Sequence, residues 1–316
     1  MVDIKVLLPK IKENVPLAGY ASFKIGGWAK YFLEANTKEE LISALKIVEQ
    51  ENLHFFILAG GSNILFPDNG FDGLVIKIQF SDFKCLDSGI YAEAGAKLSD
   101  IVDLAAESGL SGLEWAAGIY GTVGGAVRGN AGAFDGSMSS AIGKVEAFDI
   151  EDKDIKSFNN QDCEFVYRES IFKKNKNLII LSAELNFVKG DKEKIEEQMC
   201  KNIEYRKENQ PLDKPSAGSI FKNPEFKIIN KELLKDYPDL KKFSSKGIVP
   251  AGFLIDKAGL GGQRIGNARI SEKHSNFIVN LGRARAEDVI NLIDLVKEKI
   301  GALFGIELEQ EIKIIK

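Results

Sequence analysis

The chain has 316 residues, of which 44% are apolar and 28% are charged, so it can bury a core and is not of the disordered class. Its formal net charge of −4 argues against a nucleic-acid binder that depends on non-specific phosphate contacts. At roughly 150 residues per domain, this length suggests about two domains.

We find no pattern typical of an export signal, a membrane span or a metal site. Residues 1–14 lack the apolar core of a signal peptide, and the low-charge stretch Trp115–Val127 is short for a span and rich in glycine. We therefore expect a cytoplasmic protein without membrane insertion. The cysteines and histidines are too scattered for a metal site or a Ser-His-Asp triad; they are Cys85, Cys163, Cys200, His54 and His274.

The first third of the chain predicts alternating helices and strands. Thr37 and Glu40 form a capping-box pattern at the start of a helix that carries apolar residues at helical spacing. The apolar runs 54–59 and 74–78 predict buried strands. A second helix is expected to be capped by Ser99 and stopped by Gly109.

The rest of the chain mixes the same kinds of element. Residues 141–188 alternate in short runs, as strands do, and a long polar helix is predicted from Asp191 to Pro211. The lysine-rich stretch 225–245 is interpreted as a surface insertion. A final helix ends at Gly305, and 306–315 is predicted as a strand. This mixture indicates an α+β fold, with a domain boundary at the polar helix.

Two glycine-rich segments are candidates for binding a phosphate or a flat ligand. Gly60–Asn63 follows a predicted strand and is either a phosphate loop or a tight turn, because it matches neither the Walker nor the GxGxxG pattern. Gly118–Gly132 contains six glycines and one charge, Arg128. Glycine disfavours helix, so we expect a loop that packs against a flat ligand and its pyrophosphate; the alternative is a flexible linker.

Three further positions offer reactive side chains. Arg168 could hold a carboxylate or stabilise negative charge, although an arginine beside a glutamate is usually a surface ion pair. Ser219 lies in a loop of small residues, where it is a proton donor or an ordinary turn cap. Period-two spacing places Glu307, Glu309 and Glu311 on one face of the last predicted strand, which is a functional or merely a solvated face.

The order of these segments along the chain is more specific than any one of them. The sequence strongly resembles the UDP-N-acetylenolpyruvoylglucosamine reductase family over nearly its whole length. The motifs that carry the resemblance are ASFKIGG (21–27), GGSN (60–63), AGIYGTVGGA (117–126), YRES (167–170), SAGSIFKNP (216–224), PAGFLIDKAGLGG (250–262) and EIK (311–313).

The resemblance implies an α+β fold with a two-lobed, vanillyl-alcohol-oxidase-like (PCMH-type) FAD-binding domain. Its lobes would be residues 1–80 and 81–190, followed by an α+β substrate-binding domain, 191–316, whose last strand returns to the active site. The implied reaction is the NADPH-dependent reduction of UDP-N-acetylglucosamine enolpyruvate to UDP-N-acetylmuramate, a step in making peptidoglycan precursors. FAD would be bound non-covalently, with NADPH as co-substrate.

The family pattern also assigns roles to residues. Arg168 would stabilise the enolate, Ser219 would donate the proton, and Glu311 would act beside the arginine. Substrate would be held by Lys222, Asn223 and Arg264, and no metal is expected. The implied FAD contacts are Ile25, Gly26, Gly27, Ala59, Gly60, Gly61, Ser62, Asn63, Ile64, Gly118, Gly121, Thr122, Gly124, Gly125, Ala126, Asn130 and Gly132.

The chain departs from the family pattern in places. Trp28 and Tyr120 stand where members often have proline. We find no extra tyrosine-bearing loop, which favours the shorter-loop branch (type II). Two alternatives stay open: another FAD oxidoreductase of the same fold, and a non-catalytic UDP-sugar-binding protein. We expect a monomer or a weak oligomer.

Overall fold

The computed structural model describes residues 4–229 and 231–316. Residues 1–3 of the N-terminal segment and Asn230 of the lysine-rich stretch lie outside the described residues. The chain forms two compact units, and each is discontinuous in sequence. Unit 1 comprises residues 1–15, 28–61 and 71–206, and unit 2 comprises residues 16–27, 62–70 and 207–316.

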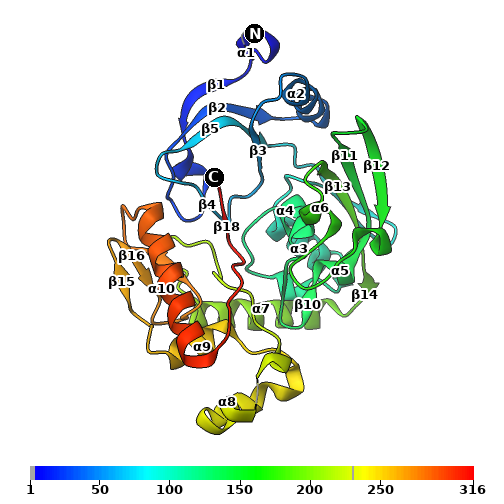
Figure 1. The fold of residues 1–316 in the computed structure, drawn as a ribbon. Helices are drawn as coiled ribbons and strands as arrows, with labels where there is room; N and C mark the ends of the chain where they lie inside the picture. Colours follow the sequence, from blue (N-terminus) through cyan, green and yellow to red (C-terminus); the bar gives the residue numbers. More distant parts are fainter. Residues whose placement is uncertain (1–3, 230) are drawn as a thin grey trace. The chain divides into compact units, whose positions relative to one another are not determined.

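Unit 1 begins with a four-stranded sheet of order β1-β2-β5-β3, in which β5 pairs in parallel with both β2 and β3 (Figure 1). The expected strands at 54–59 and 74–78 are confirmed, although the second begins three residues earlier. Helix α2 (Lys38–Gln50) covers the sheet with its predicted apolar face. The strands are β1 (Lys12–Pro16), β2 (Trp28–Ala35), β3 (Phe55–Leu58) and β5 (Phe71–Ile78).

The predicted cap of α2 is present. The hydroxyl of Thr37 accepts a hydrogen bond from the backbone N–H of Glu40 at 3.2 Å. The Glu40 carboxylate in turn accepts from the N–H of Asn36 at 2.8 Å, one residue earlier than in the standard capping box. One free N–H group of the first helical turn, and the N–H of the residue before the cap, are therefore satisfied by side chains.

A five-stranded antiparallel sheet of order β12-β11-β13-β7-β6 completes the framework of unit 1 (Figure 1). Leu33 and Ile76 of the first sheet and Val145 and Leu181 of the second belong to one hydrophobic core. The two sheets therefore contribute side chains to one common core of unit 1. The strands are β6 (Phe83–Leu86), β7 (Gly89–Glu93), β11 (Ile142–Asp149), β12 (Asp154–Asn159) and β13 (Leu178–Asn186).

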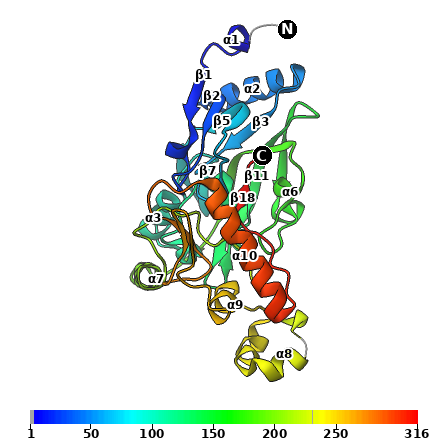
Figure 2. The ribbon, with the colours of Figure 1, turned by 60° about the vertical axis from the view of Figure 1, so that its left-hand side comes forward.

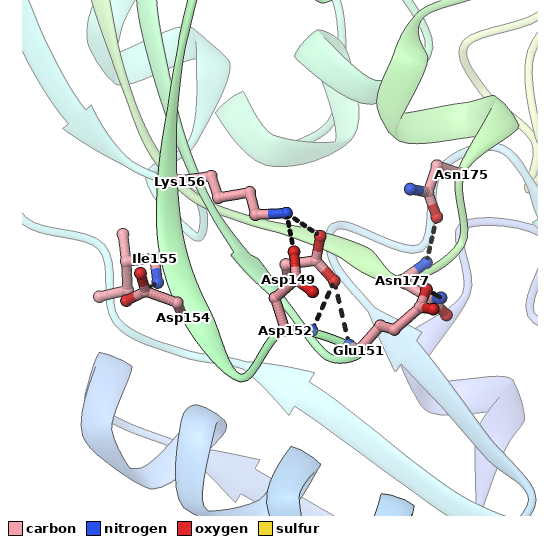
Figure 3. A network of polar contacts seen from close by, with 8 residues as sticks. All are labelled: Asp149, Glu151, Asp152, Asp154, Ile155, Lys156, Asn175 and Asn177. Atoms are coloured by element: carbon pink, nitrogen blue, oxygen red, sulfur yellow. Dashed lines mark hydrogen bonds and ion pairs between the residues drawn. The ribbon is translucent and has the colours of Figure 1, made fainter.

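Ion pairs and hydrogen bonds hold the turn between β11 and β12 (Figure 3). The Lys156 ammonium donates to the Asp149 carboxylate at 2.7 Å and also pairs with Asp152. Asp149 accepts backbone N–H groups of Glu151 and Asp152 as well, at 3.0 and 3.4 Å. These bonds hold the pKa of Asp149 below its ordinary value, chiefly through Lys156.

The expected cap of the second helix was wrong by two positions. Helix α3 (Leu98–Glu107) has Lys97 as its N-cap, and the Ser99 hydroxyl instead donates to Asp100. Leu98 is fully buried, so packing draws it into the first turn. The predicted stop holds, since Gly109 has φ +64.

Shorter elements and one long helix fill the rest of unit 1. Helix α7 confirms the predicted polar helix and packs on the core through Ile195, Met199 and Ile203. The elements are α1 (Ile4–Leu7), β8 (Leu110–Ser111), η2 (Glu114–Ala116), α4 (Val123–Arg128), β9 (Gly132–Ala133), β10 (Gly136–Ser137), α5 (Met138–Ala141), η3 (Asn160–Cys163), α6 (Ile171–Lys174), β14 (Val188–Lys189) and α7 (Lys192–Asn209).

Unit 2 is built on helix α10 (Ala286–Phe304), which confirms the predicted final helix and lies against a small antiparallel sheet of order β15-β16-β17 (Figure 2). Its buried side chains join those of α9 in a second core. The other elements are η1 (Leu17–Tyr20), β4 (Ile64–Leu65), η4 (Phe226–Ile228), α8 (Lys231–Asp236), η5 (Pro238–Lys246), α9 (Ala251–Lys257), β15 (Arg264–Ile265), β16 (Ala268–Ile270), β17 (Ile278–Asn280) and β18 (Lys313–Ile314).

The lysine-rich stretch 225–245 is not structureless. It forms η4, α8 and η5, and it sends Ile229, Leu233 and Leu240 into the core of unit 2. Tyr237 packs its ring on Phe304 of α10 with centroids 4.7 Å apart. The stretch is thus anchored by apolar contacts.

The long strand expected at 306–315 was wrong. Only β18 is regular, and it pairs in parallel with β4 through Lys313↔Ile64 and Ile314↔Leu65. Gln310, upstream, makes an isolated bridge to Phe221. The segment changes partner between these points, so the chain is extended but not one continuous strand. Within the part of the chain that the structure describes, no helix has the length and apolar character to cross a membrane.

Candidate active site

The two glycine-rich segments of unit 1 lie against each other. Strand β3 ends at Leu58, and Ala59-Gly60-Gly61 follows at its carboxyl end. A Cβ on Gly60 would lie 2.9 Å from the Cα of Gly121 and 3.2 Å from the N of Thr122. The chain can approach this closely only because both positions lack a side chain. These two predicted cofactor segments therefore meet at one place in unit 1.

The expectation that Gly118–Gly132 is a loop throughout was wrong, because Val123–Arg128 forms helix α4. A Cβ on Gly124 would lie 2.8 Å from the Cβ of Ala94, whereas a Cβ on Gly125 would meet nothing closer than 3.7 Å. The N–H groups of Val123 and Gly124 donate to carbonyls of Ala96 and Ala94, each at 2.9 Å. Close packing beside β7 thus outweighs the low helix propensity of glycine.

Thr122 supplies a hydroxyl without a partner at this point. The residue is 6% exposed, and its Oγ1 is buried and makes no hydrogen bond to any residue that the structure describes. It precedes α4 without capping it. A buried polar group that makes no hydrogen bond is costly, by about 1–3 kcal/mol, so its retention favours a ligand as partner.

Lys77 lies beneath the first glycine loop and was missed by sequence reasoning. Its ammonium donates to the carbonyl of Ala59 at 2.8 Å and to that of Ile78 at 3.1 Å. Burial lowers the pKa of Lys77, and the charge of Glu34 partly offsets this. The available signal was a lone lysine within the apolar run of β5.

Arg168 occupies a tight turn that is fastened to α4. The N–H of Val166 donates to the carbonyl of Glu169, and the N–H of Glu169 donates back, at 3.2 and 3.1 Å. Arg168 itself has φ +58. The Asn130 side chain donates to the Val166 carbonyl at 2.8 Å, and the Ser170 hydroxyl donates to the Arg128 carbonyl at 2.7 Å. The turn therefore carries Arg168 beside the second glycine segment.

Lys173 fixes the same turn from the other side. Its ammonium donates to the Arg168 carbonyl and pairs with the Glu169 carboxylate, both at 2.8 Å. The Arg168 guanidinium lies 5.2 Å from the ring centroid of Tyr167, whose side chain is exposed. Glu169 thus has a lysine partner within this turn.

The remaining predicted cofactor residues come together in unit 2. Gly27 donates its N–H to the Pro67 carbonyl at 2.9 Å, and a Cβ on Gly26 would lie 2.8 Å from the Cβ of Phe66. The Ser22 hydroxyl donates to the carbonyl of Ser216 at 2.6 Å. Segments 21–27, 62–68 and 216–219, which are far apart in sequence, are therefore neighbours.

The chain segments that carry Ser219 and Glu311 are joined by backbone pairing. The N–H of Glu311 donates to the Ile220 carbonyl, and the N–H of Lys222 donates to the Glu309 carbonyl, each at 2.8 Å. The Asn63 amide donates to the Glu311 carbonyl at 3.2 Å. Glu311 is thus bonded both to a predicted cofactor residue, Asn63, and to Ile220, the neighbour of Ser219 in the chain.

Each residue expected to hold substrate also has a partner within unit 2. Lys222 is 8% exposed and pairs with Glu309 at 2.5 Å. The Asn223 side chain accepts the N–H of Ala251 at 3.0 Å, at the start of α9. Arg264 is exposed and bonds the Gly266 carbonyl and the Asn267 side chain at 2.7 and 2.8 Å. Substrate contact by these three stays a prediction.

The residues present fit a flavin dinucleotide. Unit 1 offers apposed glycines, a buried hydroxyl without a partner and a half-buried ammonium behind the loop, which together suit a pyrophosphate and a flat ring. Residues 4–229 and 231–316 contain no group of three His, Cys, Asp or Glu side chains arranged to ligate a metal ion.

Family models match two parts of the chain. Residues 29–153 match the model described as "FAD binding domain". Residues 210–315 match the model described as "UDP-N-acetylenolpyruvoylglucosamine reductase, C-terminal domain". The first match contains the glycine segments of unit 1, and the second contains Ser219 and Glu311. The expected α+β fold with an FAD-binding part and a distinct C-terminal part is thereby confirmed.

Relatives matched over nearly their full length agree with these family-model matches. UDP-N-acetylenolpyruvoylglucosamine reductase of Anoxybacillus flavithermus is 40% identical, over 96% of this chain and 94% of the relative. That of Caldanaerobacter subterraneus is 39% identical, over 98% of both. The crystal structure of the Thermus caldophilus enzyme (MurB) is 34% identical, with a TM-score of 0.77 over 97% of this chain and 100% of that one. The chain therefore belongs to the UDP-N-acetylenolpyruvoylglucosamine reductase family.

Proposed function

We propose that this chain reduces UDP-N-acetylglucosamine enolpyruvate to UDP-N-acetylmuramate, with FAD as its cofactor and NADPH as the electron donor. The observation that carries the proposal is the backbone pairing of the Ser219 loop with the Glu311 segment, at 2.8 Å between the Glu311 nitrogen and the Ile220 oxygen. Family membership and the FAD-binding match support it independently. The product is a precursor of peptidoglycan.

Hydride transfer from NADPH to the enolpyruvyl methylene carbon is the chemistry that FAD would supply when bound. The proposed contacts in unit 1 are the backbone of Ala59–Gly61, the start of α4 with the hydroxyl of Thr122, and Asn130. Those in unit 2 are Ile25–Gly27 and Ser62–Ile64. Residues 1–80 and 81–190 are proposed as the two FAD-binding lobes, and 191–316 as the part that binds substrate.

The protein's own residues must then stabilise the negative charge that develops and donate one proton. Hydride addition at the methylene carbon spreads charge into the adjacent carboxylate as an enolate. The Arg168 guanidinium stabilises that charge, since a cation in a desolvated site acts most strongly where charge develops. Ser219 donates its proton to the neighbouring carbon. A serine is a weak acid, and it can serve here because the acceptor is a strongly basic, carbanion-like centre.

Glu311 takes part in the same step. Lys222 and Asn223 hold the polar part of the substrate from the same loop as Ser219, and Arg264 contributes from β15. We also propose a cytoplasmic location, where UDP-sugars and NADPH are available, and a monomeric or weakly associated state. Light scattering on the eluting peak of a size-exclusion column would measure the latter.

The two half-reactions can be tested in one cuvette by visible absorption without oxygen. NADPH should bleach the flavin bands, and UDP-N-acetylglucosamine enolpyruvate should restore them. Bleaching without recovery would favour another FAD oxidoreductase of this fold. A protein that stays colourless with added FAD would favour a UDP-sugar-binding protein without catalysis.

A substitution of Ser219 should affect only the second half-reaction, the transfer from reduced flavin to substrate. In Ser219→Ala, bleaching by NADPH should be unchanged, while recovery with substrate should slow by about 10²–10⁴-fold. Ser216→Ala, in the same loop, is the matched control and should recover at the normal rate. Normal recovery in Ser219→Ala would disprove the assigned proton donor.

A further inference from the structure

A polar cluster of unit 1 lies outside the residues assigned so far. It forms where the first turn of α2 meets the five-stranded sheet, and its central group is the ammonium of Lys38. That ammonium donates to the hydroxyl of Tyr91 at 2.6 Å and to the hydroxyl of Ser182 at 3.4 Å. The carboxylates of Glu93 and Glu146 each lie 3.9 Å from it. One side chain of α2 thus contacts the strands β7, β11 and β13.

The cluster is largely shielded from water. The side chain of Lys38 is 20% exposed and that of Glu93 is 15% exposed, while Ser182 is 1% exposed. The Ser182 hydroxyl accepts from the lysine and donates to the Glu146 carboxylate at 2.9 Å. Because solvent screens such groups less, these contacts are stronger than those of an ion pair on the surface.

Lys38 is also unusual as the first residue of α2. A positive charge at a helix N-terminus is opposed by the helix dipole, and the next two residues, Glu39 and Glu40, have the favoured sign. Helix formation therefore does not explain a lysine at this position. Its contacts with the second sheet do explain it.

The partners of this lysine are chain neighbours of the residues that hold α4. Ser182 follows Leu181, whose carbonyl accepts the N–H of Ala94 at 2.9 Å. The carbonyl of Ala94 in turn accepts the N–H of Gly124 at 2.9 Å, and Glu93 directly precedes Ala94. The cluster is thus one residue along the chain from the hydrogen bonds that hold the start of α4.

Helix α2 lies on the other sheet of unit 1, of order β1-β2-β5-β3, whose strand β3 leads into Ala59–Gly61. Through α2, Lys38 therefore joins the sheet that carries one glycine segment to the sheet that carries the other. The two segments meet closely, since a Cβ on Gly60 would lie 2.9 Å from the Cα of Gly121. A small shift between the sheets would change this contact.

We propose that Lys38 is a positioning residue for FAD. It fixes the sheet that carries Ala59–Gly61 relative to the strand that holds the start of α4, and so keeps the two glycine segments in the arrangement to which the cofactor binds. The proposal rests on the proposed function, which assigns FAD contacts to both segments. Lys38 acts through its bonds to Tyr91 and Ser182.

The test is fluorescence titration of the apoprotein with FAD, at a temperature at which circular dichroism shows each variant to be fully folded. Lys38→Met should raise the FAD dissociation constant about tenfold or more, because a misplaced binding group loses much of its effect. Lys38→Arg, which keeps the charge, should recover part of the affinity.

Tyr91→Phe is a milder second variant, since it removes only the hydroxyl that accepts from Lys38 and keeps the ring. It should weaken FAD binding in the same direction and by less. Combined with Lys38→Met it should add little further loss, because both substitutions remove the same contact. Full additivity of the two losses would count against the proposal.

The matched control is Lys153→Met. Lys153 also joins α2 to the second sheet, through Glu49 at 2.9 Å, but this pair is exposed and lies at the other end of the helix. Its removal should change the FAD dissociation constant by less than about twofold. An unchanged dissociation constant in Lys38→Met would overturn the proposal, as would equal losses in the Lys38 and Lys153 variants.

A purely structural role for Lys38 gives a different result. Lys38→Met would then unfold at a lower urea concentration, yet the folded variant would bind FAD as tightly as the unsubstituted protein, and this result would overturn the proposal. If the unsubstituted protein binds no FAD, the proposal fails together with the cofactor assignment. If it binds FAD in a manner that depends on Lys38 but does not reduce the substrate, only the reductase assignment fails.

Discussion

The ammonium of Lys77 donates to two backbone carbonyls and makes no ion pair among the residues that the structure describes. Burial lowers the pKa of Lys77. In the protein without cofactor the charged form is therefore disfavoured, so this residue adds stability as pH rises from its lowered pKa toward 10.5, its ordinary value. A diphosphate bound at the Ala59–Gly61 loop would act in the opposite direction and favour the ammonium.

Lys77→Met should consequently weaken FAD binding by about tenfold at pH 7, equal to about 1.4 kcal/mol. In the unsubstituted protein the FAD dissociation constant should rise as pH increases through the pKa of Lys77, because the ammonium is then lost. The methionine variant should lack that alkaline step. Quenching of flavin fluorescence on titration of the apoprotein measures both effects.

Lys30→Met provides the control at the residue scale. Lys30 belongs to the same sheet, but its ammonium is exposed and pairs with Asp72 at 2.9 Å. Its removal should leave the FAD dissociation constant and its pH dependence unchanged. If the Lys77 and Lys30 variants behave alike, the charge beneath the loop has no part in binding the cofactor.

At the scale of elements, α4 depends on a glycine that faces β7. Gly124→Ala would bring a Cβ to 2.8 Å from Ala94, so one of the two backbones must shift. Overpacking of this kind costs about 1–3 kcal/mol. Urea unfolding of the apoprotein should show that loss in the free energy of unfolding.

Gly125→Ala tests the effect of helix propensity in α4 without the steric effect of a crowded Cβ. Gly125 is exposed, and its added Cβ would meet nothing closer than 3.7 Å. The apoprotein of this variant should be at least as stable as the unsubstituted apoprotein. Because alanine favours helix, its free energy of unfolding could be higher by up to about 1 kcal/mol. Equal destabilisation by both substitutions would mean that the contact with Ala94 is not the cause.

The stability that the β11–β12 turn contributes should depend on pH (Figure 3). The pKa of Asp149 lies below its ordinary value of 3.8, so the stability that it contributes is present above 3.8 and is lost as pH falls through the lowered pKa. Asp149→Asn should cost about 1 kcal/mol at pH 7 and nothing in strong acid. Asp154→Asn, which removes only a contact to the neighbouring Ile155 N–H, should be near neutral at both. Thermal unfolding between pH 2 and 7 measures the difference.

At the scale of the whole molecule, a bound cofactor should stabilise the fold. Predicted FAD contacts occur in both compact units, and binding to the native state alone adds about 2.7 kcal/mol at a hundredfold excess over the dissociation constant. The melting temperature should therefore rise with FAD concentration. A melting temperature that does not respond to FAD would contradict the proposed cofactor.

Much of the local structure could be predicted from the sequence. Helices α2, α7 and α10 and strand β3 follow from apolar spacing and end signals, because these depend on near neighbours in the chain. The start of α3, helix α4 and the short β18 could not be predicted. Each depends on a distant partner: the burial of Leu98, the contact of Gly124 with Ala94, and the change of pairing from Phe221 to Ile64.

The sequence by itself determined the family, through the order of its motifs, and it identified the candidate residues Arg168, Ser219 and Glu311. Only the tertiary structure decided that segments 16–27 and 62–70 cluster with the C-terminal part of the chain. It also decided that the Ser219 loop pairs with the Glu311 segment through Ile220 and that Lys77 supports the loop after β3. Periodicity reports the face on which a side chain lies, whereas contacts between distant segments depend on packing, which no local pattern encodes.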